Sequence, residues 1–88
     1  MVYIIGHIPP KGNLNDWAIR FNALVDRYSY NIRGQFYGHT HSDHFSFFPD
    51  FSNKSDIKSA SLSNYYLVAP SLTTYSDRIP EYRVMEVD

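Results

Sequence analysis

Near its middle the sequence carries Ile32-Arg33-Gly34-Gln35-Phe36-Tyr37-Gly38-His39, a run of strand-forming residues that ends in a glycine and a histidine. The same pattern occurs once before, in Val2-Tyr3-Ile4-Ile5-Gly6-His7. Both runs contain β-branched and aromatic side chains, which favour strands, and a glycine closes each of them. The repeated pattern therefore predicts two strands, Val2–Ile5 and Ile32–Tyr37, with a histidine just after the end of each.

Between the two runs, apolar side chains recur at intervals of three and four residues, which is the spacing of one helix face. They are Leu14, Trp17, Phe21, Leu24, Val25 and Tyr28. The spacing predicts one main helix over about residues 14–29, with Asn13 as its N-cap and Asp16 in its first turn. We expect the stripe of Trp17, Phe21 and Leu24 to pack against a sheet.

A strand, a helix of this length and a second strand make a βαβ unit, in which the two strands run parallel. In open α/β sheets ligands bind at the carboxyl ends of the strands. Because the two predicted strands end at the same side of the sheet, we expect His7 and His39 to meet there.

The rest of the chain predicts more sheet. Three further strands are expected at Phe45–Phe48, Tyr65–Ala69 and Tyr82–Val87, separated by polar or proline-containing segments. A chain of 88 residues holds one small core. The predicted class is therefore α/β, with one main helix and about five strands.

Composition excludes several classes of function. Eight basic residues balance nine acidic ones without any basic cluster, so there is no nucleic-acid-binding signature and no sign of an anionic-membrane binder. The apolar start of the chain is too short for a signal peptide or a transmembrane segment, and the absence of cysteine excludes disulfides and thiolate ligands. The tripeptide Asn53-Lys54-Ser55 is a glycosylation acceptor pattern, a pointer to a secreted glycoprotein.

The histidines carry the chemistry. His39 and His41 are two residues apart, so on an extended strand both rings would leave the same face. Zinc accepts neutral imidazole nitrogens, and a catalytic site uses three protein ligands, which His7, His39 and His41 could supply. A lone histidine such as His44 is more often a structural residue than a ligand. Asp43 is either an acceptor that orients a histidine or an exposed turn residue.

Several strings resemble the acid sphingomyelinase family of calcineurin-like metallophosphoesterases. These strings are Val2 to Pro10, Gln35-Phe36-Tyr37-Gly38-His39-Thr40-His41-Ser42-Asp43, Ala69-Pro70-Ser71 with Thr73-Thr74-Tyr75, and Tyr82-Arg83-Val84. The Gly-His-Thr-His string is shared widely among metallophosphoesterases, whereas the others narrow the resemblance to the sphingomyelinase branch. The resemblance covers nearly the whole chain.

What the resemblance implies is a phosphodiesterase with a four-layer αββα sandwich, in which two divalent metal ions, usually zinc, activate water. By the same resemblance His7 and His39 would bind one ion and His41 the other, and Tyr75 would lie near the substrate. The substrate would be a sphingomyelin-like phospholipid or a nucleotide-type phosphodiester, and the location secreted or lysosomal.

The family pattern also contains strings that this sequence lacks. Its Asp-x-His pair, its metal-bridging aspartate and its Asn-His, which supplies the proton-donating histidine, do not occur in these 88 residues. The resemblance therefore implies that residues 1–88 are the C-terminal portion of a phosphoesterase domain, without catalytic acid or base and inactive alone. The chain also departs from the pattern at Lys11, His44 and Ile79, none of which is a ligand position.

Two other hypotheses stay open. In one, the three histidines hold a single zinc ion for structure, without turnover. In the other, the chain is an aromatic-rich β interaction domain with incidental histidines, and replacing His39 by alanine leaves stability and ligand binding unchanged.

Overall fold

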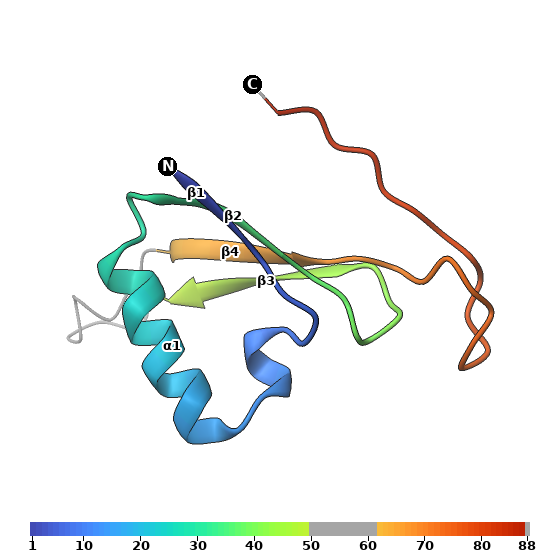
Figure 1. The fold of residues 1–88 in the computed structure, drawn as a ribbon, viewed down its shortest axis with the longest axis horizontal. Coiled ribbons are helices and arrows are strands. Elements are labelled where there is room, and N and C mark those ends of the chain that lie inside the picture. Colours follow the sequence, from blue (N-terminus) through green and yellow to red (C-terminus); the bar gives the residue numbers. More distant parts are fainter. Residues whose placement is uncertain (50–61, 88) are drawn as a thin grey trace.

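The computed structural model describes residues 1–49 and 62–87. Its elements follow the predicted order closely (Figure 1). They are β1 (Val2–Ile5), the 3₁₀ turn η1 (Pro10–Gly12), α1 (Asn15–Arg27), β2 (Ile32–Tyr37), β3 (His44–Pro49) and β4 (Leu62–Val68). The tripeptide Asn53-Lys54-Ser55 lies outside the described residues.

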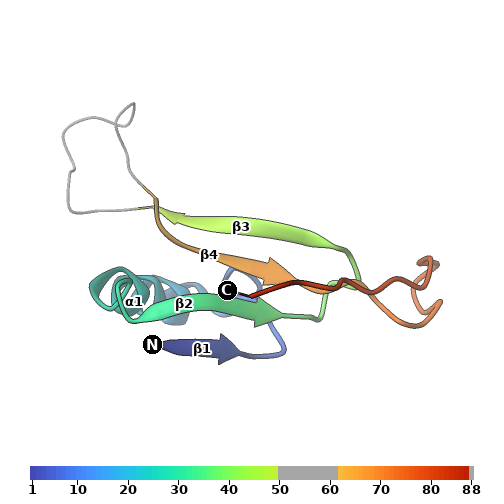
Figure 2. The same ribbon diagram turned by 90° about the horizontal axis from the view of Figure 1, so that it is seen from above.

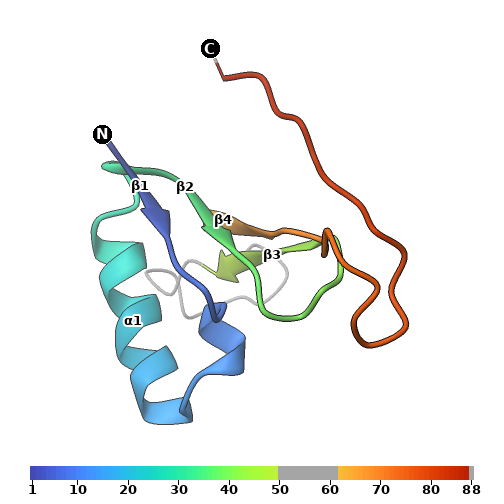
Figure 3. The same ribbon diagram turned by 45° about the vertical axis from the view of Figure 1, so that its right-hand side comes forward.

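The four strands form one mixed sheet in the order β1-β2-β4-β3. β1 pairs with β2 in parallel, β2 with β4 in parallel, and β3 with β4 antiparallel (Figure 2). The βαβ prediction is therefore confirmed. α1 packs on one face of this sheet, so the described residues make a small α/β arrangement of one helix and one sheet (Figure 3); the αββα sandwich remains a prediction.

The prediction of a fifth strand at Tyr82–Val87 is wrong for the described residues. This segment is an extended chain that runs back past the sheet without joining it (Figure 1). The backbone N–H of Glu81 donates to the carbonyl of Ser71 at 2.8 Å, but no ladder of backbone hydrogen bonds follows in the part that the structure describes. The alternation of side chains suits a strand, but no strand of the described residues lies beside this segment to pair with it.

The start of α1 also differs from the prediction. Leu14, not Asn13, occupies the N-cap, and no side chain caps the helix. The Asn13 amide instead donates to the carbonyls of Ile8 and Pro9, at 3.3 and 3.0 Å, and so holds the turn that contains η1. Asp16 lies in the first turn as predicted. No helix in the described ranges is long and apolar enough to span a bilayer.

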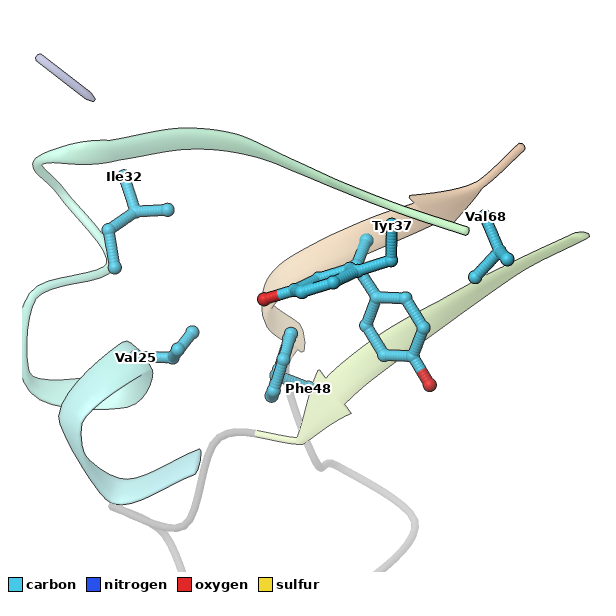
Figure 4. Close-up of a cluster of buried hydrophobic side chains, with 6 residues drawn as sticks. Val25, Ile32, Tyr37, Phe48 and Val68 are labelled. Atoms are coloured by element: carbon cyan, nitrogen blue, oxygen red, sulfur yellow. The ribbon is translucent and has the colours of Figure 1, made fainter. Parts of the chain in front are cut away.

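The hydrophobic core lies between α1 and the sheet (Figure 4). Its buried members are Val25, Ile32, Tyr37, Phe48, Tyr66 and Val68. The predicted packing of the helix stripe is correct for Phe21 but not for Trp17 and Leu24, which remain 45% and 53% exposed. Trp17 stacks on Phe21 with ring centroids 4.8 Å apart, so it covers the edge of the core rather than entering it.

The opposite face of the sheet carries exposed aromatic side chains. Successive side chains of β3 point to opposite faces of the sheet, and Phe48 points into the core. Phe45 and Phe47 therefore point to the other face, where they are 59% and 51% exposed. Phe47 lies opposite Tyr65 of β4 in the register, and Tyr3 of β1 contacts Phe36 of β2 with ring centroids 6.0 Å apart. No helix or strand of the described residues covers this aromatic face, although Tyr82 and Met85 of the extended tail line a pocket with Phe36.

A buried polar chain joins β2 to β4. Gln35 is fully buried, and its Oε1 accepts a hydrogen bond from the Tyr37 hydroxyl at 3.0 Å. Its Nε2 donates to Oδ1 of Asn64 at 3.0 Å, and Nδ2 of Asn64 donates to the carbonyl of Ile32 at 2.9 Å. A buried polar group without a partner is costly, so each of these bonds stabilises the pairing of the two strands.

Burial of Tyr37, with a smaller contribution from neighbouring Tyr66, raises the pKa of its hydroxyl from 10.0 to about 12. Because this pKa is higher in the folded chain than in the unfolded chain, the neutral hydroxyl stabilises the fold fully below pH 10.0. We expect the free energy of unfolding to fall as the pH rises from 10.0 toward about 12. Urea unfolding across this pH range would measure the decrease in the free energy of unfolding, which should be smaller in Tyr37→Phe. An equal decrease in both chains would contradict the raised pKa of Tyr37.

Candidate metal centre

The two Gly-His pairs lie side by side at one edge of the sheet. β1 ends at Ile5 and β2 at Tyr37, and the parallel pairing continues past both ends. The N–H of Gly6 donates to the carbonyl of Phe36 at 3.0 Å, and the N–H of Gly38 donates to the carbonyl of His7 at 2.9 Å. The backbone thus fixes His7 next to the segment that carries His39.

The rings of these two histidines meet, as the βαβ unit predicts. Nε2 of His7 lies 3.3 Å from Nδ1 of His39. The rings are close to perpendicular, at 81°, with centroids 5.2 Å apart. Two imidazole nitrogens that face each other can share one proton or can both bind a cation placed between them.

The glycine before His7 is required by packing. A Cβ at Gly6 would lie 2.9 Å from the ring of Tyr37, which is buried in the core. At Gly38 a Cβ would lie 3.8 Å from Nδ1 of His7, an ordinary contact. Packing therefore leaves no room for a side chain at Gly6, whereas it does not exclude one at Gly38.

The prediction that His39 and His41 share one face of an extended strand is wrong. β2 ends before them, and both residues adopt positive φ, 76° at His39 and 59° at His41. This left-handed conformation is uncommon for residues other than glycine and costs free energy. The two histidines are therefore presented by a tight turn, residues 38–43, which we call the histidine turn.

In this turn His41 lies next to the C-terminal region of the chain. Its ring lies against the ring of Tyr75, with centroids 5.6 Å apart. Its Nδ1 is buried and has no hydrogen-bond partner among the described residues. Within residues 1–49 and 62–87, no three His, Asp or Glu side chains gather closely enough to hold one ion. The three histidines thus do not form a single cluster.

The neighbouring residues take structural partners. Nδ1 of His44 lies 3.0 Å from the carbonyl oxygen of Ser42, which agrees with the structural interpretation of this histidine. The carboxylate of Asp43 forms an ion pair with Arg83 and is not bonded to a histidine in the described part. The sequence did not single out Arg83 for this role, because no spacing rule links residues so far apart in the chain.

The comparison with protein-family models finds no match. The comparison with curated proteins finds sphingomyelin phosphodiesterases of Bos taurus and Homo sapiens, 45% and 42% identical over 87 residues. Each match covers 99% of this chain and 13% of the relative. An acid sphingomyelinase-like phosphodiesterase 3b of Mus musculus is 30% identical over 89 residues, covering 91% of this chain and 18% of the relative.

The fold and the paired histidines define a small α/β unit with two imidazoles at adjacent ends of parallel strands. By sequence, the chain is a relative of the sphingomyelin phosphodiesterases along nearly its whole length, so the resemblance is confirmed. It spans about an eighth of the length of the bovine and human relatives, since it covers 13% of each.

Proposed function

We propose that this chain is one part of a metal-dependent phosphodiesterase domain that hydrolyses a sphingomyelin-like phospholipid, to which it contributes metal ligands. The relatives named sphingomyelin phosphodiesterase support the reaction and the substrate class. The observation that carries the proposal is the separation of 3.3 Å between Nε2 of His7 and Nδ1 of His39. A nucleotide-type phosphodiester is the alternative substrate.

The histidine pair fits a zinc ion. Imidazole nitrogens bind zinc at roughly 2.0 to 2.1 Å, so two ligands at tetrahedral angles lie about 3.3 Å apart. The two ring nitrogens already have this separation, and the hydrogen-bonded backbone of Gly6 and Gly38 holds it. His7 and His39 would therefore bind one ion without rearrangement of the strands.

His41 would bind the second ion. An imidazole nitrogen that is buried without a partner loses free energy unless a ligand satisfies it, and Nδ1 of His41 is in this position within the described part. Tyr75, whose ring contacts His41 and is 73% exposed, would stand beside the substrate. When bound, two divalent ions supply Lewis-acid polarisation of the phosphodiester and activation of water.

The remaining ligands and the acid for the leaving group would come from outside this chain. Among the residues that the structure describes, the histidine pair is one ligand short of a three-ligand catalytic zinc site. The exposed aromatic face supports the same view, because a sheet face of this kind is normally covered by another layer. We therefore propose that the isolated chain is inactive. From the resemblance alone, we also propose that the complete protein is secreted or lysosomal.

A single structural zinc held by three histidines is less well supported. That hypothesis needs His7, His39 and His41 around one ion, and in the described residues His41 lies against Tyr75 rather than with the other two. The geometry favours a shared two-ion site over a mononuclear module.

A segment exchange tests the proposal. In the bovine sphingomyelin phosphodiesterase, the matched segment would be replaced by this chain, which is 45% identical to it over 87 residues. We expect this chimera to hydrolyse sphingomyelin at a rate within about tenfold of the bovine enzyme and to lose activity on removal of zinc by a chelator. A chimera that melts at the same temperature as the bovine enzyme yet does not hydrolyse sphingomyelin would contradict the proposal.

A further inference from the structure

The segment after β4 folds back over the histidine turn. Its first attachment is the N–H of Ala69, which donates to the carbonyl of Tyr37 at 2.8 Å. Its neck is closed by the N–H of Glu81, which donates to the carbonyl of Ser71 at 2.8 Å. Residues 70–82 therefore form a loop whose two ends lie close together, which we call the clamp loop. Positive φ values at Ser76 and Asp77, 62° and 56°, mark the point where the loop reverses.

The clamp loop and the residue that follows it each contact the histidine turn at one point. The ring of Tyr75 lies against the ring of His41, with centroids 5.6 Å apart. Just beyond the loop, the guanidinium of Arg83 forms an ion pair with the carboxylate of Asp43. A pocket of about 320 Å³ separates these contacts, lined by His41 and Asp43 on one side and by loop residues such as Ile79 on the other.

The ion pair links the tail after the clamp loop to the histidine turn. This tail forms no strand in the described residues; Tyr82 and Met85 line a pocket with Phe36 of the sheet, whereas Arg83 makes the charged contact with the histidine turn. Asp43 stands two residues after His41, and Arg83 stands two residues after the neck of the loop. Losing the pair would therefore free the loop to move away from His41 while the core stays intact.

We propose that Arg83 and Asp43 are a positioning pair, which holds the clamp loop on the histidine turn and so keeps Tyr75 against His41. The consequence for a metal ligand rests on the proposed function, but the positioning itself does not. Both side chains keep about a third of their surface exposed, 34% and 33%, so the pair is expected to add little to global stability. Its effect should appear locally, at the ring of His41.

The first test reads the histidine rings directly in the metal-free chain. With histidine ring carbons labelled for NMR, Tyr75→Leu identifies the His41 signal, because it removes the ring current of Tyr75. We expect Arg83→Glu, which replaces attraction by repulsion, to move the His41 signal toward its position in Tyr75→Leu. The charge exchange Asp43→Arg with Arg83→Asp should restore at least half of the shift.

Arg78→Glu is the matched control, since Arg78 lies in the same loop and forms no ion pair with any described residue. It makes the same change of charge and should leave the His41 signal in place. An unchanged signal in Arg83→Glu, an equal shift in Arg78→Glu, or a shift that the charge exchange does not restore would each overturn the positioning role.

A second measurement uses the chimera and separates the two proposals. We expect Arg83→Glu to lower kcat/KM for sphingomyelin about tenfold, with an unchanged melting temperature, and the charge exchange to recover most of the loss. If the NMR result holds in a chimera that has no activity at all, the positioning pair stands and the proposed function fails. If activity is present but indifferent to Arg83→Glu and the NMR signal does not move, the positioning pair fails alone.

Discussion

Replacing His39 by alanine in the chimera should lower the turnover of sphingomyelin at least 100-fold. The substitution removes one of two nitrogens that stand 3.3 Å apart, at the separation expected for ligands of one zinc ion. His7 alone would hold that ion weakly, because loss even of a group that only orients a metal ligand typically costs 10- to 100-fold in metal affinity or activity. Initial rates at saturating sphingomyelin, with zinc added, would measure the effect.

His44→Ala is the control for this experiment. His44 is also a histidine of this region, but its ring nitrogen faces the carbonyl of Ser42 and it is not proposed as a ligand. We expect it to keep most of the activity. Equal rates for His39→Ala and the unaltered chimera would favour the third hypothesis, in which the histidines are incidental to an aromatic-rich interaction domain.

Gln35→Ala should lower the free energy of unfolding of the chain by about 3 to 5 kcal/mol. The side chain is fully buried, so its removal leaves a cavity, and the Tyr37 hydroxyl loses its acceptor. Asn64 is less affected, because its Oδ1 also accepts from the N–H of Tyr65 at 2.9 Å. Unfolding in urea, followed by far-UV circular dichroism, would give the difference.

A double-mutant cycle shows whether the hydrogen bond is responsible. Combined with Tyr37→Phe, Gln35→Ala should cost less than the sum of the two single changes, since the hydroxyl that lost its acceptor is gone. Tyr30→Phe removes a hydroxyl from a side chain that is 94% exposed and should change nothing. Strict additivity in the cycle would contradict the role assigned to the Tyr37–Gln35 bond.

The elements that the sequence predicted well are those with a strong local signal. The bounds of β1 and β2 match the two strand-forming runs that end in glycine, and the parallel pairing follows from the helix between them. The meeting of His7 and His39 was predictable for the same reason, because the topology alone brings the two strand ends together.

The errors came where local pattern does not determine structure. Tyr82–Val87 has the composition of a strand, but a strand also requires a partner, and none lies beside it in the described residues. The left-handed backbone at His39 and His41 broke the two-residue periodicity on which their common face depended. Asn13 was free to bond either to the helix or to the preceding turn, and it bonds to the turn.

Long-range polar contacts were beyond prediction from one sequence. Gln35 and Asn64 are 29 residues apart in the sequence, and residues of both types are mostly exposed in proteins. The Arg83–Asp43 ion pair likewise depends on the course of the clamp loop, which no periodicity encodes. The candidate ligands could thus be identified from the sequence, whereas the long-range contacts that hold the surrounding structure in place could not.

The central claim is that His7 and His39 together bind one zinc ion and His41 another. It is tested most directly by the zinc content of the purified chimera, measured by elemental analysis after dialysis. The account predicts about two zinc ions per chain in the chimera and about one after His7→Ala, His39→Ala or His41→Ala in a protein with an unchanged melting temperature. An undiminished zinc content in all three variants would contradict it.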